Sequence, residues 1–238
     1  MSAVDRRDYT GEGLSEAELA PTPWRQARLW VDEADRRAVA RDDVPEPRAL
    51  SVATVDLRGA PNVRTVLMRF FDERGPGFVT SVDSTKGREL RGNAHVAAAL
   101  TWPAMFRAIR FRGVVEELDR EEVTTYWASR PWGSRISAWA SRQSEPALGR
   151  AQIEESYDRY AVQFPDHGDA VDVPVPDFWG GFRVRAGEVE FWAGRRNRLH
   201  DRIVFTAVGA GGGAAAADVA VCPSLDDAAA WVVGRRQP

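Results

Sequence analysis

Several residue types that mark common kinds of site are scarce in this chain of 238 residues. Its single cysteine, Cys222, excludes an internal disulfide and any metal site built from several thiolates. The three histidines, His95, His167 and His200, are widely separated and lack metal-ligand spacing, so no metal site is predicted. No apolar run reaches the roughly 20 residues that a membrane-spanning helix needs, and we therefore predict no membrane partner.

Positive and negative side chains are nearly balanced, with 32 basic and 35 acidic residues. The net charge of −3 at pH 7 argues against a strongly basic nucleic-acid-binding protein. The first 14 residues are charged and lack the apolar core of a signal peptide, which predicts a cytoplasmic protein. Lysine is nearly absent, because only one of the 32 basic side chains, Lys86, is a lysine. That makes Lys86 a residue to follow.

The pattern of apolar residues predicts helices and many short strands with tight turns between them. Helices are expected at residues 23–41, 86–91, 120–129 and 147–164, with Thr22 as the cap of the first. Strands are expected at residues 49–55, 62–70, 78–80, 96–102, 107–118, 181–185, 188–192, 201–207 and 231–235. Residues 130–144, rich in small polar side chains, are assigned no element. This pattern favours an antiparallel barrel over a parallel α/β sheet.

The length and the 44% of hydrophobic residues fit a single domain, which we expect over residues 23–238. Residues 1–22 are polar and are expected to form a flexible N-terminal segment. The glycine- and alanine-rich stretch at about 209–218 is expected to be a flexible surface insertion.

Two segments carry residue types that suit a phosphate group. Ser84-Thr-Lys-Gly-Arg88 places hydroxyls and an ammonium at the start of a short helix, where backbone amides are free. Tyr126 and Arg130 share a helix face, and Ser134 follows just after the helix end. The alternatives are a capped helix with a solvated lysine and an exposed polar helix end.

Arginines on predicted strands form two further candidates. Arg64 and Arg69 are five positions apart, so strand alternation puts them on opposite faces unless a bulge or a second subunit intervenes. Arg198, His200 and Arg202 alternate and are expected to share one face of a strand. An exposed strand edge is the alternative in both cases.

Taken together, five ordered segments resemble the pyridoxamine 5'-phosphate oxidase family. They are Arg64-Thr-Val-Leu-Met68, Ser129-Arg-Pro-Trp-Gly-Ser134, Ala138-Trp-Ala-Ser-Arg-Gln-Ser144, Phe178-Trp-Gly-Gly-Phe182, and Glu190-Phe-Trp-Ala-Gly194 joined to Arg198-Leu-His-Asp-Arg202. The resemblance implies an α+β fold, an antiparallel split β-barrel flanked by helices. It also implies a homodimer with FMN bound at the subunit interface. At such an interface Arg64 and Arg69 could both contribute to a site although they lie on opposite faces of a strand.

The resemblance assigns expected roles to single residues. FMN contacts fall on Arg64, Thr80, Lys86, Gln143, Ser144, Trp192 and Arg202. Contacts to the substrate phosphate fall on Arg69, Tyr126, Arg130 and Ser134. Arg198 and His200 lie over the substrate ring as catalytic residues, and Arg6 and Tyr9 of the N-terminal segment close over the bound substrate as a lid.

The sequence departs from the family pattern at four positions. Arg69 stands where the family usually has lysine, and Val79 replaces a tyrosine beside the flavin. Thr85 replaces an arginine near the FMN phosphate, and Ala108 replaces a glutamine that contacts the flavin ring. Three flavin contacts are therefore weakened, whereas the residues for the substrate phosphate are largely retained.

The function implied by the resemblance is an FMN-dependent oxidase. It would convert pyridoxamine or pyridoxine 5'-phosphate to pyridoxal 5'-phosphate and reduce O2 to hydrogen peroxide. One alternative is a related FMN-dependent oxidase of secondary metabolism that acts on a dihydrophenazine, although such relatives tend to lose the substrate-phosphate residues. The other is a non-catalytic binder of flavin or pyridoxal phosphate.

Overall fold

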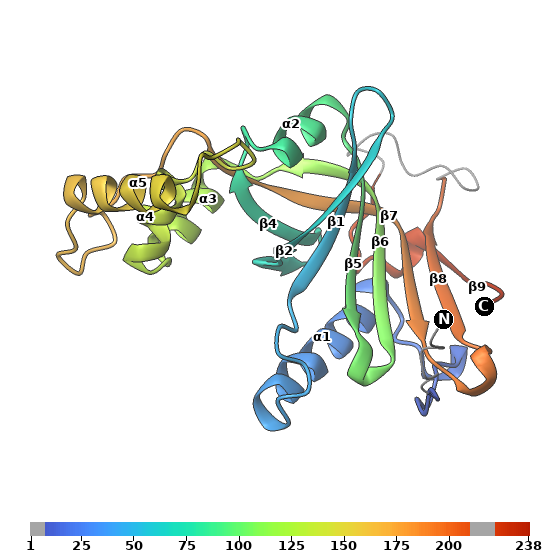
Figure 1. The fold of residues 1–238 in the computed structure, drawn as a ribbon. Coiled ribbons are helices and arrows are strands. Elements are labelled where there is room, and N and C mark those ends of the chain that lie inside the picture. The colour runs from blue at the N-terminus through green and yellow to red at the C-terminus, as the bar shows by residue number, and fades with distance from the viewer. Residues whose placement is uncertain (1–7, 210–221) are drawn as a thin grey trace, which may run out of the picture.

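The computed structural model describes residues 8–209 and 222–238, which form an antiparallel sheet with helices at its sides (Figure 1). The helices are α1 (Pro23–Ala40), α2 (Thr85–Gly92), α3 (Arg120–Ala128), α4 (Trp132–Ala140) and α5 (Arg150–Gln163), with single 3-10 turns at Glu16–Glu18, Pro103–Met105, Arg196–Arg198 and Ala228–Ala230. The strands are β1 (Ala49–Val55), β2 (Pro61–Leu67), β3 (Phe70–Asp72), β4 (Gly75–Ser81), β5 (His95–Trp102), β6 (Arg107–Glu117), β7 (Trp179–Ala193), β8 (Asp201–Ala207) and β9 (Trp231–Arg235). The expected α+β class with an antiparallel split barrel is confirmed.

The long strand β7 is where the sheet divides. Along one side it pairs with β6 over nearly its whole length. Along the other side its first residues pair with β4 and its last residues pair with β8, which in turn pairs with β9. Figure 1 shows β7 running from the group of helices α3, α4 and α5 to the sheet edge formed by β8 and β9. One strand therefore links two halves of the barrel.

Two strands were expected where β7 is continuous. The predicted break falls at Ala186 and Gly187, where the register between β6 and β7 shifts next to Gly113. A Cβ on Gly113 would lie 2.0 Å from the carbonyl oxygen of Arg185, so the two backbones approach closely there. A β-bulge bends the strand at this point without ending it.

The single strand expected over residues 62–70 is wrong at its end. β2 stops at Leu67, and the amide of Met68 donates to the carbonyl of Arg48 over 2.9 Å. The next amide, that of Arg69, donates to the carbonyl of Gly77 over 2.8 Å. The backbone thus changes partner from β1 to β4 between two consecutive residues. Strand alternation therefore says nothing about the relative directions of Arg64 and Arg69.

The main core lies between the sheet and α1. Thr22 caps this helix as predicted, because its Oγ1 accepts a hydrogen bond from the amide of Arg25. The buried face of α1 includes Trp30, whose ring meets the ring of Phe191 on β7 edge-on at 5.4 Å. Burial of such aromatic pairs fixes α1 against the concave side of the sheet.

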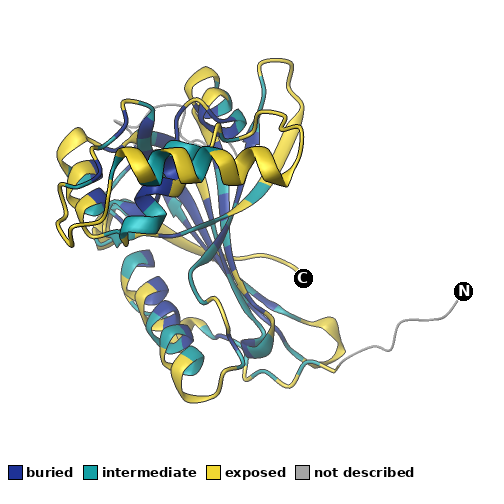
Figure 2. Ribbon diagram, turned by 60° about the vertical axis from the view of Figure 1, so that its left-hand side comes forward, coloured by how far each residue is buried: buried dark blue, intermediate teal, exposed yellow. Residues whose placement is uncertain are grey.

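A second, smaller core joins α3, α4 and α5 to the first residue of β7. Helix α4 lies in the stretch to which the sequence analysis assigned no element. Trp132, Ile136 and Trp139 recur at helical spacing in it and pack in this core, whereas the small polar residues between them face outward or the neighbouring site. Figure 2 shows α5 mostly in the colour of exposed residues, and none of its residues is buried. Figure 1 shows α3, α4 and α5 together at one side of the sheet.

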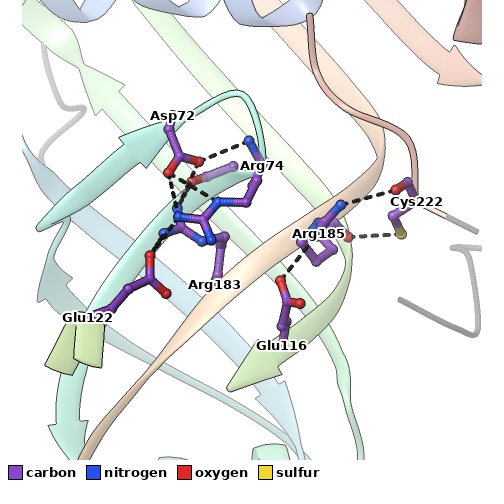
Figure 3. A network of polar contacts seen from close by, with 8 residues as sticks. Asp72, Arg74, Glu116, Glu122, Arg183, Arg185 and Cys222 are labelled. Carbon is purple, nitrogen blue, oxygen red and sulfur yellow. Dashed lines mark hydrogen bonds and ion pairs between the residues drawn. The ribbon is translucent and has the colours of Figure 1, made fainter. Parts of the chain in front are cut away.

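The buried Arg183 on β7 ties the two cores together through ion pairs with partly exposed carboxylates (Figure 3). Its guanidinium, 1% exposed, donates to Asp72 at the end of β3 and to Glu122 on α3, each over 2.9 Å. Arg74 bonds to the same two carboxylates from the rim. Nearby, Arg185 pairs with Glu116 over 3.0 Å. The two ion pairs with Glu122 hold α3 against the sheet.

The described part of the N-terminal segment is attached to the far end of the sheet. The amide of Leu14 donates to Asp201 over 2.9 Å, and Leu14 is buried. Arg235 on β9 donates to both Asp201 and Glu16. Residues 8–22 are therefore held by specific contacts. Arg6 and the glycine- and alanine-rich stretch from residue 210 lie outside the described residues.

Candidate functional site

Lys86 occupies the first turn of α2, which begins after the cap residue Ser84. Its ammonium donates to Gln143 Oε1 over 2.7 Å and to Thr80 Oγ1 over 3.0 Å. A longer contact of 3.3 Å reaches Ser84 Oγ. The side chain of Lys86 is buried, and every one of these acceptors is neutral.

Lys86 therefore differs from an ordinary buried lysine. In the part of the chain that the structure describes, no carboxylate lies within ion-pair distance of its Nζ. Burial, with a smaller contribution from the positive charge of Arg64, lowers the pKa of Lys86 to about 8. A buried cation is costly unless an anion compensates it, so this position is suited to a negatively charged ligand group.

Arg64 on β2 lies close to Lys86 but already has a carboxylate partner. Its guanidinium donates to Glu89 over 2.8 Å and to Thr54 Oγ1 over 2.6 Å. Burial raises the pKa of Glu89, but hydrogen bonds from Thr54, Asn62 and Arg64 outweigh it, so that the pKa is lowered overall. Glu89 thus stays ionised and neutralises Arg64. The net positive charge of this region resides on Lys86.

These residues line one groove of about 540 Å³ between β2, β4 and the loop after α4. Five of the residues that the resemblance assigns to FMN lie on its walls: Arg64, Thr80, Lys86, Gln143 and Ser144. Ser144 adopts a left-handed backbone conformation, with φ 75°. The structure brings together these five side chains from segments far apart in the sequence.

Arg130 forms a second cationic position, at the end of α3. Its guanidinium carbon lies 4.4 Å from the ring centre of Trp179 and 5.3 Å from that of Trp127. Nη2 donates to the backbone carbonyl of Ser134 over 2.8 Å, whereas Nη1 is buried without a partner among the described residues. The hydroxyl of Ser134 has no part in this contact.

The charged groups that act on Arg130 are Arg69 and Tyr126 of the predicted phosphate set, together with Arg135. Burial lowers the pKa of Arg130, the positive charges of Arg69 and Arg135 lower it further, and Tyr126 opposes them. Arg69 is exposed at the turn between β2 and β3, and Tyr126 packs against Phe70 at 5.7 Å. Arg69, Tyr126, Arg130 and Ser134 therefore lie in one region, where neither Arg69 nor Arg130 forms an ion pair with a carboxylate of the described residues.

A third group lies at the far end of β7. The ring of Tyr9 is 5.0 Å from the ring of His200 and 5.9 Å from that of Trp192. The guanidinium of Arg198 lies over Tyr9 at 5.2 Å. Burial, and then the charge of Arg198, lower the pKa of His200. The amide of Arg195 donates to His200 Nδ1 over 3.1 Å and so fixes the ring.

The expectation that Arg198, His200 and Arg202 share a strand face is wrong. β8 begins only at Asp201, and Arg198 precedes it with φ 62°. Of the three, Arg202 alone is on the strand, where it forms a double ion pair with Glu190 at 3.0 and 2.9 Å. The alternating sequence was misleading because a turn with left-handed residues was read as strand.

The Lys86 groove and the third group do not meet in one chain. Thr80 pairs with Gly180 at the start of β7, and Trp192 lies 12 residues farther along the strand. At roughly 3.3 Å per residue this is a contour distance of about 40 Å. None of Trp192, Arg198, His200 and Arg202 lines the groove.

Comparison with known proteins decides the family. The family described as pyridoxamine 5'-phosphate oxidase matches residues 37–163. A second family model, described as the pyridoxine 5'-phosphate oxidase C-terminal dimerisation region, matches residues 179–238. The chain belongs to the pyridoxamine 5'-phosphate oxidase family.

Relatives within the family are similar over nearly the whole chain. A pyridoxine/pyridoxamine 5'-phosphate oxidase of Kineococcus radiotolerans is 42% identical over 233 residues, covering 98% of this chain and 97% of the relative. One from Herminiimonas arsenicoxydans is 45% identical over 207 residues, covering 87% and 93%. The presence of the family's dimerisation region supports a homodimer.

Solved structures with the same fold are more distant in sequence. PhzG from Burkholderia lata, in complex with tetrahydrophenazine-1-carboxylic acid, has a TM-score of 0.78 at 24% identity, covering 96% of this chain and all of that one. A pyridoxamine 5'-phosphate oxidase-related, FMN-binding protein from Nostoc punctiforme has a TM-score of 0.65 at 16% identity, covering 92% and 100%. At these identities the likeness concerns the fold.

The departures from the family pattern fall at two places in the fold. Val79 and Thr85 line the Lys86 groove, where side chains of tyrosine and arginine would reach farther. Ala108 on β6 pairs with Trp192 on β7, in the third group. With no arginine at position 85, Lys86 is the cation in the groove that lacks a carboxylate partner among the described residues.

Two residues of these regions, Glu89 and Trp179, were not predicted from the sequence to take part in them. Glu89 follows Lys86 by three positions, and nothing in its spacing showed that it would pair with Arg64 on another element. Trp179 was part of a family-like segment, but no role was assigned to it. Both contacts depend on the packing of elements far apart in the sequence.

Two general features complete the description. Over residues 8–209 and 222–238, no helix is both long and apolar enough to span a membrane. In the same residues, no group of three or more histidine, cysteine, aspartate or glutamate side chains is placed to hold a metal ion.

Proposed function

We propose that this protein is an FMN-dependent oxidase that converts pyridoxamine or pyridoxine 5'-phosphate to pyridoxal 5'-phosphate. One observation carries the proposal: two separate cations, the buried Lys86 and the half-buried Arg130, have no carboxylate partner among the described residues. An enzyme of this kind must bind two phosphate groups, one on the cofactor and one on the substrate. Membership of the family supports the same reaction.

The residues of the Lys86 groove fit FMN. The ammonium of Lys86 and the hydroxyl of Thr80 suit its phosphate, and the side chains of Gln143 and Ser144 border the same space. When bound, FMN accepts a hydride equivalent from the substrate and passes the electrons to O2, which yields hydrogen peroxide. The protein supplies the binding and the orientation.

Arg130, with Arg69, Tyr126 and Ser134 around it, would hold the substrate phosphate. Fixing this group at one end of the substrate restricts where the reacting carbon can lie. His200 and Arg198 would contact the substrate ring. Because the pKa of His200 is lowered and its Nδ1 accepts a hydrogen bond, the neutral ring carries its proton on Nε2. That N–H is available to donate to a substrate oxygen.

A homodimer would complete the site. The Lys86 groove and the group of Trp192, Arg198, His200 and Tyr9 are about 40 Å apart along β7, so a second copy would supply the latter group to the former. We therefore propose that FMN lies between subunits, with Arg202 and Trp192 contributed by the opposite chain. The lid role of Tyr9 and Arg6 stays a prediction, as does a cytoplasmic location.

The visible spectrum tests this function directly. Purified protein supplied with FMN should show a flavin absorption band that bleaches when pyridoxine 5'-phosphate is added without oxygen. Admission of air should restore the band and release hydrogen peroxide in equal amount. A bound flavin that stays oxidised with both phosphorylated vitamers would contradict the proposal and favour the non-catalytic binder.

The similarity in fold to PhzG raises a second candidate, an FMN-dependent oxidase acting on a reduced phenazine. The retained group of Tyr126, Arg130 and Ser134 counts against it, because a phenazine carboxylate carries no phosphate. Bleaching by a dihydrophenazine carboxylic acid, with none by pyridoxine 5'-phosphate, would favour this candidate.

A further inference from the structure

Trp179, the first residue of β7, has an unusual setting for a buried tryptophan. Its side chain is 8% exposed, yet its indole N–H has no hydrogen-bond partner among the described residues. The neighbouring Trp127 donates its own indole N–H to the carbonyl of Val173 over 2.8 Å. Buried polar groups normally have partners, so the place of Trp179 calls for another explanation.

The contact between the face of the Trp179 ring and Arg130 explains why a tryptophan is placed here. The guanidinium carbon of Arg130 lies 4.4 Å from the ring centre, closer than to Trp127 at 5.3 Å. The two indoles are tilted by 66° to each other, with centres 5.4 Å apart, so they form two walls around the guanidinium. An aromatic face attracts a cation without neutralising its charge.

The two indole rings can hold the guanidinium of Arg130 in place without neutralising its charge. A carboxylate would fix Arg130 but would also compete with a phosphate for the same N–H groups. The two indoles and the carbonyl of Ser134 fix the guanidinium and leave its full positive charge. Arg135, which is buried, shows the contrast, because its Nη1 and Nη2 donate to the backbone carbonyls of Ala170 and Asp169 and so hold the loop that contains them.

The position of Trp179 in the sheet also connects Arg130 to the Lys86 groove. Its backbone pairs with Ser81, and the next residue, Gly180, pairs with Thr80 of the Lys86 groove. The ring that holds Arg130 is therefore carried by the same strand pair that forms a wall of the groove. This fixes the distance between the two cationic positions.

We infer that Trp179 is a positioning residue, whose indole face holds the Arg130 guanidinium in the orientation that binds the substrate's phosphate group. The inference rests on the proposed function and names a residue to which no role has been assigned. Trp179 acts through Arg130, and its effect should appear in substrate affinity rather than in the rate of the chemical step.

Two substitutions test this. Trp179→Phe keeps an aromatic face and removes no hydrogen bond, since the indole N–H makes none with the described residues. Trp179→Leu removes the face and keeps an apolar side chain. The KM for pyridoxine 5'-phosphate should rise roughly threefold in Trp179→Phe and roughly tenfold or more in Trp179→Leu, with kcat within about twofold of wild type.

Trp139→Leu is a matched control. Trp139 belongs to the same core, packs against Phe178 beside Trp179, and donates its indole N–H to the carbonyl of Pro174. It makes no contact with Arg130 among the described residues. This variant should lose stability at least as much as Trp179→Leu and leave KM unchanged.

Binding without turnover separates this inference from the proposed function. The Kd of pyridoxal 5'-phosphate on the flavin-loaded protein should rise in the order wild type, Trp179→Phe, Trp179→Leu, while the Kd of FMN stays constant. If wild type binds pyridoxal 5'-phosphate and Trp179→Leu binds it equally well, the inference is wrong and the proposed function stands. If wild type binds no phosphorylated vitamer, the proposed function fails first.

Discussion

Two buried cations of this protein, Arg183 and Lys86, have opposite surroundings. Arg183 lies between the carboxylates of Asp72 and Glu122, and Arg74 shares both (Figure 3). Lys86 is also buried, and among the described residues its ammonium donates to neutral oxygens alone. The first arrangement is complete within the chain, whereas the second leaves a positive charge uncompensated. We therefore expect Arg183 to serve the fold and Lys86 to serve a ligand.

The same distinction separates arginines that looked alike in the sequence. Arg64 and Arg202 each have a carboxylate partner, Glu89 and Glu190. Arg130 has none among the described residues and is held by aromatic rings instead. We therefore expect substitution of a paired cation to cost mainly stability, and substitution of Lys86 or Arg130 to cost mainly ligand affinity.

The largest effect on stability should follow removal of Arg183. Arg183→Met leaves Asp72 and Glu122 with Arg74 as their remaining partner, so the free energy of unfolding should fall by about 3 kcal/mol. Chemical denaturation of the flavin-free protein measures this. The FMN affinity of the folded fraction should not change.

Arg74→Met is the matched control for Arg183→Met. Arg74 bonds to the same carboxylates, but its side chain is 42% exposed, so we expect a loss below about 1 kcal/mol. Equal losses in the two variants would show that burial does not set the strength of this cluster.

Unlike Arg183→Met, Lys86→Met should weaken FMN binding and leave the stability of the protein unchanged or increased. It removes a buried charge that has no ion-pair partner, so the flavin-free protein should be as stable as wild type or more stable. The Kd for FMN should rise roughly 30-fold, because a charge-assisted hydrogen bond to phosphate is lost. Flavin fluorescence during titration measures this Kd.

Arg88→Met serves as the control for Lys86→Met, since Arg88 is exposed on the same helix. Its Kd for FMN should stay within about twofold of wild type. A loss of FMN affinity as large as that of Lys86→Met would mean that general positive charge, not the buried ammonium, holds the phosphate.

A smaller effect should appear as a pH dependence of FMN binding. The pKa of Lys86 is about 8 in the unliganded protein, so the ammonium is present below pH 8 and is lost as the pH rises through that value. The FMN phosphate is already a dianion above about pH 7. The Kd should therefore rise roughly tenfold between pH 7 and pH 9. Lys86→Met should show no such rise.

The stability of the flavin-free protein should change with pH in the other direction. Between pH 8 and the ordinary lysine pKa of 10.5, the unfolded chain keeps a proton that the folded chain has lost. The unfolded state then binds more protons, so stability rises with pH over this range. Thermal unfolding at both ends of this pH range measures the change. The part of the rise in stability that Lys86 causes should be present in wild type and absent in Lys86→Met.

Local signals in the sequence were enough for most elements of the fold. The segment over β1 and the start of α1 at Pro23 matched, because alternation, the Thr22 cap and the flanking prolines all act within a few residues. Errors arose where contacts between residues far apart in the sequence determine the ends and the continuity of strands. β2 ends at Leu67 because Met68 and Arg69 bond to different strands, and the bulge near Gly187 depends on its pairing with β6.

The candidate site could be predicted only in part for the same reason. The segment around Lys86 indicated a phosphate site from its own composition, and the family resemblance added Thr80 and Gln143. The absence of a carboxylate beside Lys86, and the pairing of Arg64 with Glu89, depend on how α2 packs against β2. These contacts decide which cation carries free charge.

The most direct test is a set of four binding constants: FMN and pyridoxal 5'-phosphate, each titrated into Lys86→Met and Arg130→Leu and compared with wild type. Lys86→Met should weaken FMN binding roughly 30-fold and, once saturated with FMN, bind pyridoxal 5'-phosphate within about twofold of wild type. Arg130→Leu should show the reverse pattern. Equal losses of both ligands in both variants would contradict the assignment of two separate phosphate positions.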